Sequence, residues 1–351
     1  MKKFYMMFVA VAAMTTISCN KELGQNDGVA ESKKGTLIQV AVGTPEPCVE
    51  TKVSSFVPLA SNKTPKWDAE DSFQLFSFDA ANGIVTNWDK FVTTEGSTSE
   101  YNANATFIGY IPVGFTNATG GSTFTAVVTN EFNPSYTFTH DSSKSRYTFN
   151  CNIPSEQDGT GLKYSLFASA PQYKSGSSYV DLKYDEATKA LSGFRFQFRS
   201  ALCALTLPSG SNVVKIEITM SYENEENAST QFLASRDNAQ DLKWVANNNI
   251  DFVSGGGSKT ITIYNNGDIL PEDTTPVYFA CVRTNSGGKS SGNELGKCML
   301  TFQFTNQAGL VAEKVVTLHN GTKALNIANG NNLNNFGTVN FADGDFKAVT
   351  E

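Results

Sequence analysis

The sequence is poor in the residues that most enzyme active sites need. Only two histidines occur among 351 residues, His140 and His319, and neither stands beside a nucleophile motif. No GxSxG or HExxH motif is present, and the acidic group Asp68, Glu70 and Asp71 lacks the spacing of a calcium-binding loop. We therefore predict that the chain is not an enzyme and that it needs no metal or cofactor.

Cysteine is also scarce, and its spacing excludes two common uses. No CxxC pair occurs, so the spacing of a zinc site is missing. If Cys19 is modified, as argued below, five cysteines remain, and an odd number cannot form a closed disulfide framework. Cys203 and Cys281 stand in apolar runs and are expected to be small core residues, while a pair such as Cys281–Cys298 stays open. The six cysteines are Cys19, Cys48, Cys151, Cys203, Cys281 and Cys298.

Positive charge and long apolar runs are lacking as well. The chain has 27 Lys and Arg against 34 Asp and Glu, a formal net charge of −7. A negative surface argues against nucleic acid as a partner and against adhesion to anionic lipid. The apolar run at residues 4–13 is too short for a transmembrane helix, and no other apolar run is long enough.

The first nineteen residues read as a targeting segment. Lys2 and Lys3 precede an apolar run at residues 4–13, and small residues then lead to Cys19. This order resembles a bacterial lipobox, so we expect residues 1–18 to be removed and Cys19 to carry lipid chains such as palmitate. The polar residues 19–35 would form a flexible tether to the outer membrane. The alternative is an ordinary secretory signal with an unrelated cysteine.

The remaining sequence is typical of an all-β protein. It contains 25 Phe and 12 Tyr and is rich in Thr, Ser, Asn and Gly. Apolar and polar residues alternate in many short stretches, which predicts antiparallel β-sandwiches. Short helices are expected only within residues 185–191 and 226–241. The clearest alternating sets are Ile38/Val40/Val42, Phe73/Leu75 opposite Phe76/Phe78, Phe124/Ala126/Val128, Phe194/Phe196/Phe198, Ile216/Ile218/Met220, Ile261/Ile263 and Phe302/Phe304.

A turn at residues 208–210 is the best domain boundary. It follows a predicted long strand at residues 194–207, which could pass from one domain to the next. We therefore predict an N-terminal β-sandwich over residues 36–207, whose first strand covers residues 36–42, and a C-terminal β-sandwich over residues 208–351.

Several local patterns, taken in order, resemble the fimbrillin-like surface lipoproteins of Gram-negative gut and oral anaerobes. The likeness covers most of the chain after residue 18, although each pattern alone is degenerate. Two positions depart from the family: Lys52 replaces the usual Arg, and Glu70 replaces the usual Gly before Asp71. The patterns are the lipobox, TKV (51–53), PKWDAEDSFQLF (65–76), FIGYIP (107–112), YSLFA (164–168) and FRFQFRSALCAL (194–205).

The resemblance implies two transthyretin-like β-sandwich domains in series and a fimbrial (pilus) subunit or anchor that acts in adhesion. It also implies maturation by a protease that cuts after a basic residue in the loop behind the first strand, here Lys52. Loss of the strand that carries Ile38, Val40 and Val42 would open a groove. A strand from another fimbrial subunit, or from a second copy, would fill this groove by β-strand addition. Lys52 could equally be an ordinary solvated loop residue.

The competing function is that of a glycan-binding outer-membrane lipoprotein of a polysaccharide-uptake system. Such a protein needs exposed aromatic platforms for sugar rings. Only three tryptophans occur, and Trp67 fits the predicted strand pattern as a core residue. Trp88 and Trp244 are the freer candidates for a sugar platform.

Overall fold

The computed structural model shows strands joined by turns. Among the described residues there is no α-helix, only the two 3-10 helices η2 (Leu162–Tyr164) and η3 (Glu225–Ala228), so the predicted all-β class is confirmed. In the same part of the chain, no helix is long and apolar enough to cross a bilayer. The transthyretin-like topology and the domain limits stay predictions. The structure describes residues 35–43, 49–52, 67–79, 84–93, 104–119, 122–141, 146–149, 151–169, 172–175, 178–228, 233–235, 242–245, 249–251, 257–282, 289–290, 293–294, 298–320, 323–324 and 332–349.

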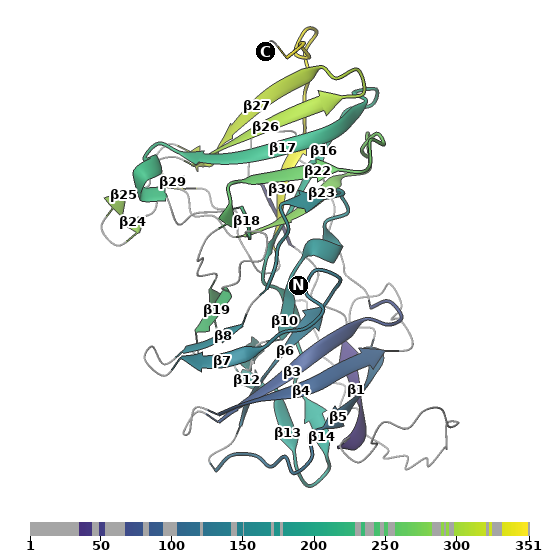
Figure 1. Cartoon of the computed structure of the whole chain (residues 1–351), viewed down its shortest axis with the longest axis vertical. Coiled ribbons are helices and arrows are strands. Elements are labelled where there is room, and N and C mark those ends of the chain that lie inside the picture. Colours follow the sequence, from purple (N-terminus) through teal and green to yellow (C-terminus); the bar gives the residue numbers. More distant parts are fainter. Residues whose placement is uncertain are drawn as a thin grey trace, which may run out of the picture. The chain divides into compact units, whose positions relative to one another are not determined.

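The first large sheet has seven strands, and each neighbouring pair is antiparallel (Figure 1). β3 lies at its centre and is buried on both faces. Phe73 and Leu75 pack on one side, while Phe76 and Phe78 pack on the other, as their alternation predicts. In sheet order the strands are β1 (Thr36–Gly43), β5 (Asn104–Ile111), β4 (Ile84–Thr93), β3 (Ser72–Asp79), β6 (Thr123–Thr129), β10 (Phe167–Ser169) and β15 (Phe196–Phe198).

One face of this sheet builds the cluster that we call the N-terminal core. Its centre is aromatic: the rings of Phe73 and Phe91 stack at 5.1 Å between centroids, and Trp67 meets Phe107 edge-on at 5.0 Å. Such aromatic contacts stabilise a core beyond the burial of their area. The N-terminal core consists of Ile38, Val40, Val42, Trp67, Phe73, Leu75, Trp88, Phe91, Ala105, Phe107, Ile111, Phe124, Ala126, Phe167, Leu182, Tyr184, Leu191, Phe196, Phe198, Leu202, Ala204, Tyr278 and Leu333.

Two further sheets contribute to a second cluster, the C-terminal core, which contains among others Ile216, Ile218, Phe302 and Phe336. Apolar residues of both sheets belong to this cluster, as expected when two sheets pack face to face. The four-stranded sheet runs β2 (Val49–Lys52), β30 (Asn332–Thr338), β16 (Ala201–Thr206) and β23 (Val277–Cys281), and the five-stranded sheet runs β27 (Val311–Thr317), β26 (Cys298–Asn306), β17 (Val213–Tyr222), β22 (Thr260–Tyr264) and β9 (Glu156–Gln157).

β16 connects the two cores. All six of its residues are buried, because each face of the strand meets a different cluster. Ala201, Cys203 and Leu205 belong to the C-terminal core, whereas Leu202 and Ala204 belong to the N-terminal core. The four-stranded sheet therefore packs on apolar residues on both of its faces, which explains why this stretch reads as a continuous apolar run.

Small sheets account for the remaining strands. His140 lies in β7 and His319 in β28. The small sheets are β11 (Gln172–Ser175) with β12 (Ser178–Asp181); β13 (Lys183–Asp185) with β14 (Ala190–Ser192); β20 (Asn249–Asp251), β19 (Leu242–Val245), β8 (Arg146–Phe149) and β7 (Phe138–Asp141); β18 (Ala234–Ser235) with β21 (Gly257–Ser258); β24 (Lys289–Ser290) with β25 (Asn293–Glu294); and β28 (His319–Asn320) with β29 (Lys323–Ala324).

Two sequence-based expectations about strands and helices are wrong. The single strand predicted at residues 194–207 is broken between β15 and β16, which lie in different sheets. At the break, the Arg199 N–H donates to the Leu166 carbonyl, and the Ser200 hydroxyl accepts from the Leu166 N–H. Residues 185–191 form no helix: they are the ends of β13 and β14 and the turn between them, in which the Asp185 carboxylate accepts hydrogen bonds from the Ala187 and Thr188 N–H groups. Of residues 226–241, only the short η3 is helical among those described.

Candidate functional site

β1 forms one edge of the seven-stranded sheet. It pairs along its whole length with β5, from Thr36 opposite Ile111 to Gly43 opposite Asn104, and with no other strand among the described residues. The strand, TLIQVAVG, carries no charged residue. Edge strands usually carry a charge, a proline or a bulge that discourages pairing with other chains, and β1 has none of these.

The two faces of β1 have opposite character. Ile38, Val40 and Val42 are buried, with Val40 and Val42 each only 1% exposed, and all three belong to the N-terminal core. Leu37, 54% exposed, and Gln39 point to the other face. The alternation read from the sequence is therefore the alternation in the sheet, and β1 closes one side of a hydrophobic core.

The packing of the core next to β1 depends on a glycine of the neighbouring strand β5. Ile38, Val40 and Val42 lie opposite Gly109, Phe107 and Ala105 of β5. A Cβ atom at position 109 would lie 2.5 Å from the ring of Phe91, so only glycine leaves room for that ring. Removal of β1 would therefore uncover an apolar surface bounded by the edge of β5.

The other two predicted site residues are Cys19 and Lys52. Cys19 lies outside the described residues. Lys52 was predicted in a loop, but it is the last residue of β2 and pairs with Asn335 of β30. The strand β2 was not predicted, because four residues between proline-containing segments give too short a pattern to recognise. The roles of Lys52, Ile38, Val40 and Val42 in processing and exchange stay predictions.

The turn before β3 has a conformation that favours glycine at position 70, where this chain has Glu. Glu70 has φ +71°, a left-handed conformation in which glycine is favoured, and its N–H donates to the Thr93 carbonyl at 2.8 Å. The Asp71 carboxylate accepts from the Asp68 N–H at 2.7 Å, so the acidic residues build a turn. Burial raises the pKa of Asp71. No group of His, Cys, Asp or Glu suited to a metal ion occurs in the described part of the chain.

We predict that Glu70→Gly stabilises the protein by about 0.5–1 kcal/mol. Removing the side chain relieves the left-handed strain of a non-glycine residue, and the greater freedom of glycine in the unfolded chain offsets part of this gain. Urea denaturation would measure the difference. Ala69→Gly, in the same turn but without a positive φ, is the control and should destabilise. A lower stability of Glu70→Gly would contradict the explanation.

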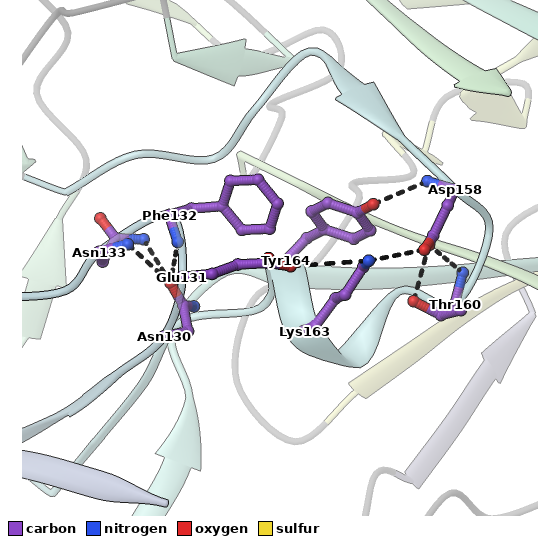
Figure 2. A network of polar contacts seen from close by, with 8 residues as sticks. All are labelled: Asn130, Glu131, Phe132, Asn133, Asp158, Thr160, Lys163 and Tyr164. Atoms are coloured by element: carbon purple, nitrogen blue, oxygen red, sulfur yellow. Dashed lines mark hydrogen bonds and ion pairs between the residues drawn. The ribbon is translucent and has the colours of Figure 1, made fainter. Parts of the chain in front are cut away.

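A polar network joins the turn after β6 to the segment around η2 (Figure 2). Lys163 Nζ lies 2.7 Å from Asp158 Oδ2 and 3.6 Å from Glu131 Oε1. The Asp158 N–H donates to the Tyr164 hydroxyl at 2.9 Å, and the Tyr164 ring packs on Phe132 at 4.9 Å between centroids. Figure 2 shows these side chains side by side, so the network fixes the approach of residues 158–164 to the β6–β7 turn.

The charges in this network shift each other's pKa values. Partial burial alone would raise the pKa of Asp158, but hydrogen bonds from Lys163 and Thr160 outweigh it and lower the pKa to about 2. The hydrogen bond to Asp158 raises the pKa of Lys163. Burial raises the pKa of Tyr164. All three groups therefore keep their ordinary charge states at neutral pH.

The low pKa of Asp158 predicts a loss of stability in acid. An acid whose folded pKa is depressed stabilises the fold above its unfolded pKa, near 4, and this contribution disappears as the pH falls toward 2. The Asp158–Lys163 ion pair is partly exposed, so its expected contribution to the free energy of unfolding is about 0.5–1 kcal/mol. Asp158→Asn should melt at a lower temperature than the wild type at pH 6, and this gap should close at pH 2. A gap that stays constant with pH would contradict the assignment.

The tryptophans do not support the sugar-platform reading. Trp67 is in the N-terminal core, as predicted. Trp88, a predicted candidate platform, is only 1% exposed, and its indole N–H donates to the Ser77 hydroxyl at 3.0 Å. It cannot stack on a sugar without leaving the core. Trp244 lies in β19, and its side chain is outside the described structure.

The cysteines lie where small core residues lie. Cys203 and Cys281 are fully buried on neighbouring strands, with their sulfur atoms 3.6 Å apart, which confirms the prediction that both are core residues. Cys298, the other partner considered for Cys281, is a buried free thiol on β26. Cys151 is also a buried free thiol. Cys48 lies outside the described residues.

Gln157 is a buried polar residue of β9 that bonds to the backbone of β23 and was not among the predicted site residues. The Gln157 side chain is 3% exposed and pairs with the backbone of Ala280 in β23 through both its atoms: Nε2 donates to the carbonyl at 2.7 Å, and Oε1 accepts from the N–H at 2.8 Å. Its Nε2 also donates to the Pro154 carbonyl at 3.0 Å. The Gln157 amide thus makes the two hydrogen bonds that a strand beside β23 would make at Ala280. No local pattern in the sequence predicts this role.

Comparisons with known proteins give structural neighbours only. No known protein family and no curated protein matches the chain. A candidate cell adhesion protein from Bacteroides fragilis is 11% identical, with a TM-score of 0.41 over 89% of this chain and 97% of that one. Another from Bacteroides uniformis is 14% identical, with a TM-score of 0.38 over 79% and 83%. A fimbrial protein from Bacteroides ovatus is 12% identical, with a TM-score of 0.31 over 82% and 46%.

Proposed function

We propose that this protein is a fimbrial subunit or anchor on the outer cell surface that acts in adhesion and accepts a partner's strand in place of β1. The observation that carries the proposal is β1 itself, an uncharged edge strand with three buried side chains and a continuous ladder to β5. The order of motifs that resembles the fimbrillin-like lipoproteins supports the same reading. The role is non-enzymatic and needs no cofactor.

The proposed steps follow from the physics of sheet edges. Cys19 holds the precursor at the outer membrane, and a protease cuts after Lys52. β1 then leaves, and the N–H and C=O groups of the β5 edge become free to pair. A strand from another subunit, or from a second copy, forms the ladder again and fills the positions of Ile38, Val40 and Val42. Main-chain hydrogen bonds give affinity, and the spacing of the apolar side chains fixes the register.

The decisive experiment is to determine the N-terminus of the protein sheared from intact cells, by sequencing and mass. We expect a chain that begins at Val53. The variant Lys52→Gln is the matched control and should keep residues 36–52. A start after Lys63 or Lys66 would preserve loss of the first strand but reject Lys52 as the cut site. A lipid-blocked Cys19 with residues 20–52 intact would reject removal of the strand altogether.

A further inference from the structure

β1 and β2 are consecutive in the chain but close the edges of two different sheets. β1 pairs with β5 in the seven-stranded sheet, in antiparallel orientation. β2 pairs with β30 in the four-stranded sheet, in parallel orientation, from Val49 opposite Asn332 to Lys52 opposite Asn335. Both strands precede the bond after Lys52. One cut at that bond therefore frees two edges.

We expect the strand β30, which forms the second edge, to stay in place when β2 leaves. β30 lies between β2 and β16, and its parallel ladder to β16 runs from Leu333 opposite Leu202 to Thr338 opposite Thr206. The Asn334 side chain adds a hydrogen bond from Nδ2 to the Leu202 carbonyl at 3.0 Å. Leu333 and Phe336 are fully buried, one in each core. β30 is thus anchored on the side away from β2, and its uncovered side is a sheet edge ready to pair.

We infer that the β30 edge is a second strand-binding site, and that the partner strand that replaces β1 continues into a short segment that pairs in parallel with β30. This inference rests on the proposed function. Residues 36–52 show that one continuous segment can occupy both edges, with only residues 44–48 between the two strands. The partner is therefore an extended peptide with apolar residues at every second position, a short connector and a four-residue strand.

The second contact matters because it is tethered to the first. Once the first strand is seated on β5, the short connector holds the second strand at a high effective concentration beside β30. Even a weak four-residue ladder then slows release of the whole segment. We expect a peptide that covers both edges to bind at least tenfold more tightly than one that covers only the β5 edge.

The test uses the full chain cut after Lys52, in urea just high enough for its own segment to exchange. Four labelled peptides compete with that segment, and native mass spectrometry measures the bound fraction. The peptides are residues 36–43; residues 36–52 with Cys48→Ser; and the latter with Glu50→Pro or Thr51→Pro. Successive N–H groups of a strand point to opposite sides, so only one proline removes a bond to β30, and the other is its matched control.

The outcomes separate the two proposals. Tighter binding of peptide 36–52 than of peptide 36–43, with the gain lost in one proline variant and kept in the other, would support the second site. Equal binding of peptides 36–43 and 36–52 would overturn the inference and leave strand exchange at β5 intact. Failure of every peptide to displace the native segment would reject the proposed function itself.

Discussion

Replacing Val40 by aspartate is expected to lower the free energy of unfolding of the uncut protein by about 3 kcal/mol or more. Val40 is 1% exposed and lies opposite Phe107 in the N-terminal core. A carboxylate there would be desolvated among apolar side chains with no partner of opposite charge, so the fold must either bury the charge or release β1. Urea denaturation at pH 7 would measure the loss.

The matched control for Val40→Asp is Ala41→Asp. Ala41 is the next residue of the same strand, opposite Thr106, and its side chain is exposed. Substitution there adds the same charge to the same ladder without burying it, so a change within about 0.5 kcal/mol is expected. Equal stabilities of the two variants would show that β1 does not close the core, and would remove the structural basis of the proposed function.

The second large effect is expected for Gln157→Leu, which should destabilise the protein by about 2–5 kcal/mol. Leucine fills the space of the side chain but cannot pair with Ala280, so a buried N–H and a buried carbonyl lose their partners. The cost of an unmade buried hydrogen bond is larger than the gain from making it, which is why a single amide matters here.

The matched control for this variant is Gln303→Leu, at an exposed position of β26. Its Nε2 donates to the Glu313 carboxylate at 3.3 Å on the surface, so little change is expected. Thermal melting of both variants would test the claim. Similar melting temperatures would mean that water or a small backbone shift satisfies Ala280 when Gln157 is absent.

The sequence predicts the strands in which alternate side chains face a hydrophobic core. Ile38, Val40 and Val42 are buried as their spacing predicts, and so are Ile216 and Ile218 of β17. The period-2 pattern works here because the pleat of a strand turns alternate residues to one face. This local rule was enough to find the first strand of the candidate site.

The rest could not be predicted because it depends on partners far away in the chain. Trp88 is preceded and followed by polar residues, yet it is buried by Phe115, Phe124 and Tyr184, which come from later segments. The pairing of β2 with β30 joins the two ends of the described chain and leaves no trace in local alternation. In the sequence, the left-handed turn at Glu70 shows only as a departure from the fimbrillin-like pattern that the chain resembles.

The pairing of β2 with β30 also has a consequence for how the chain folds. The paired residues are about 280 positions apart, and contacts of such long range slow folding because a large loop must close first. During synthesis, β1 and β2 emerge well before β30. The four-stranded sheet therefore cannot be completed until β30 has been made. The late arrival of β30 delays the native state, so a newly made chain stays incompletely folded until the four-stranded sheet closes.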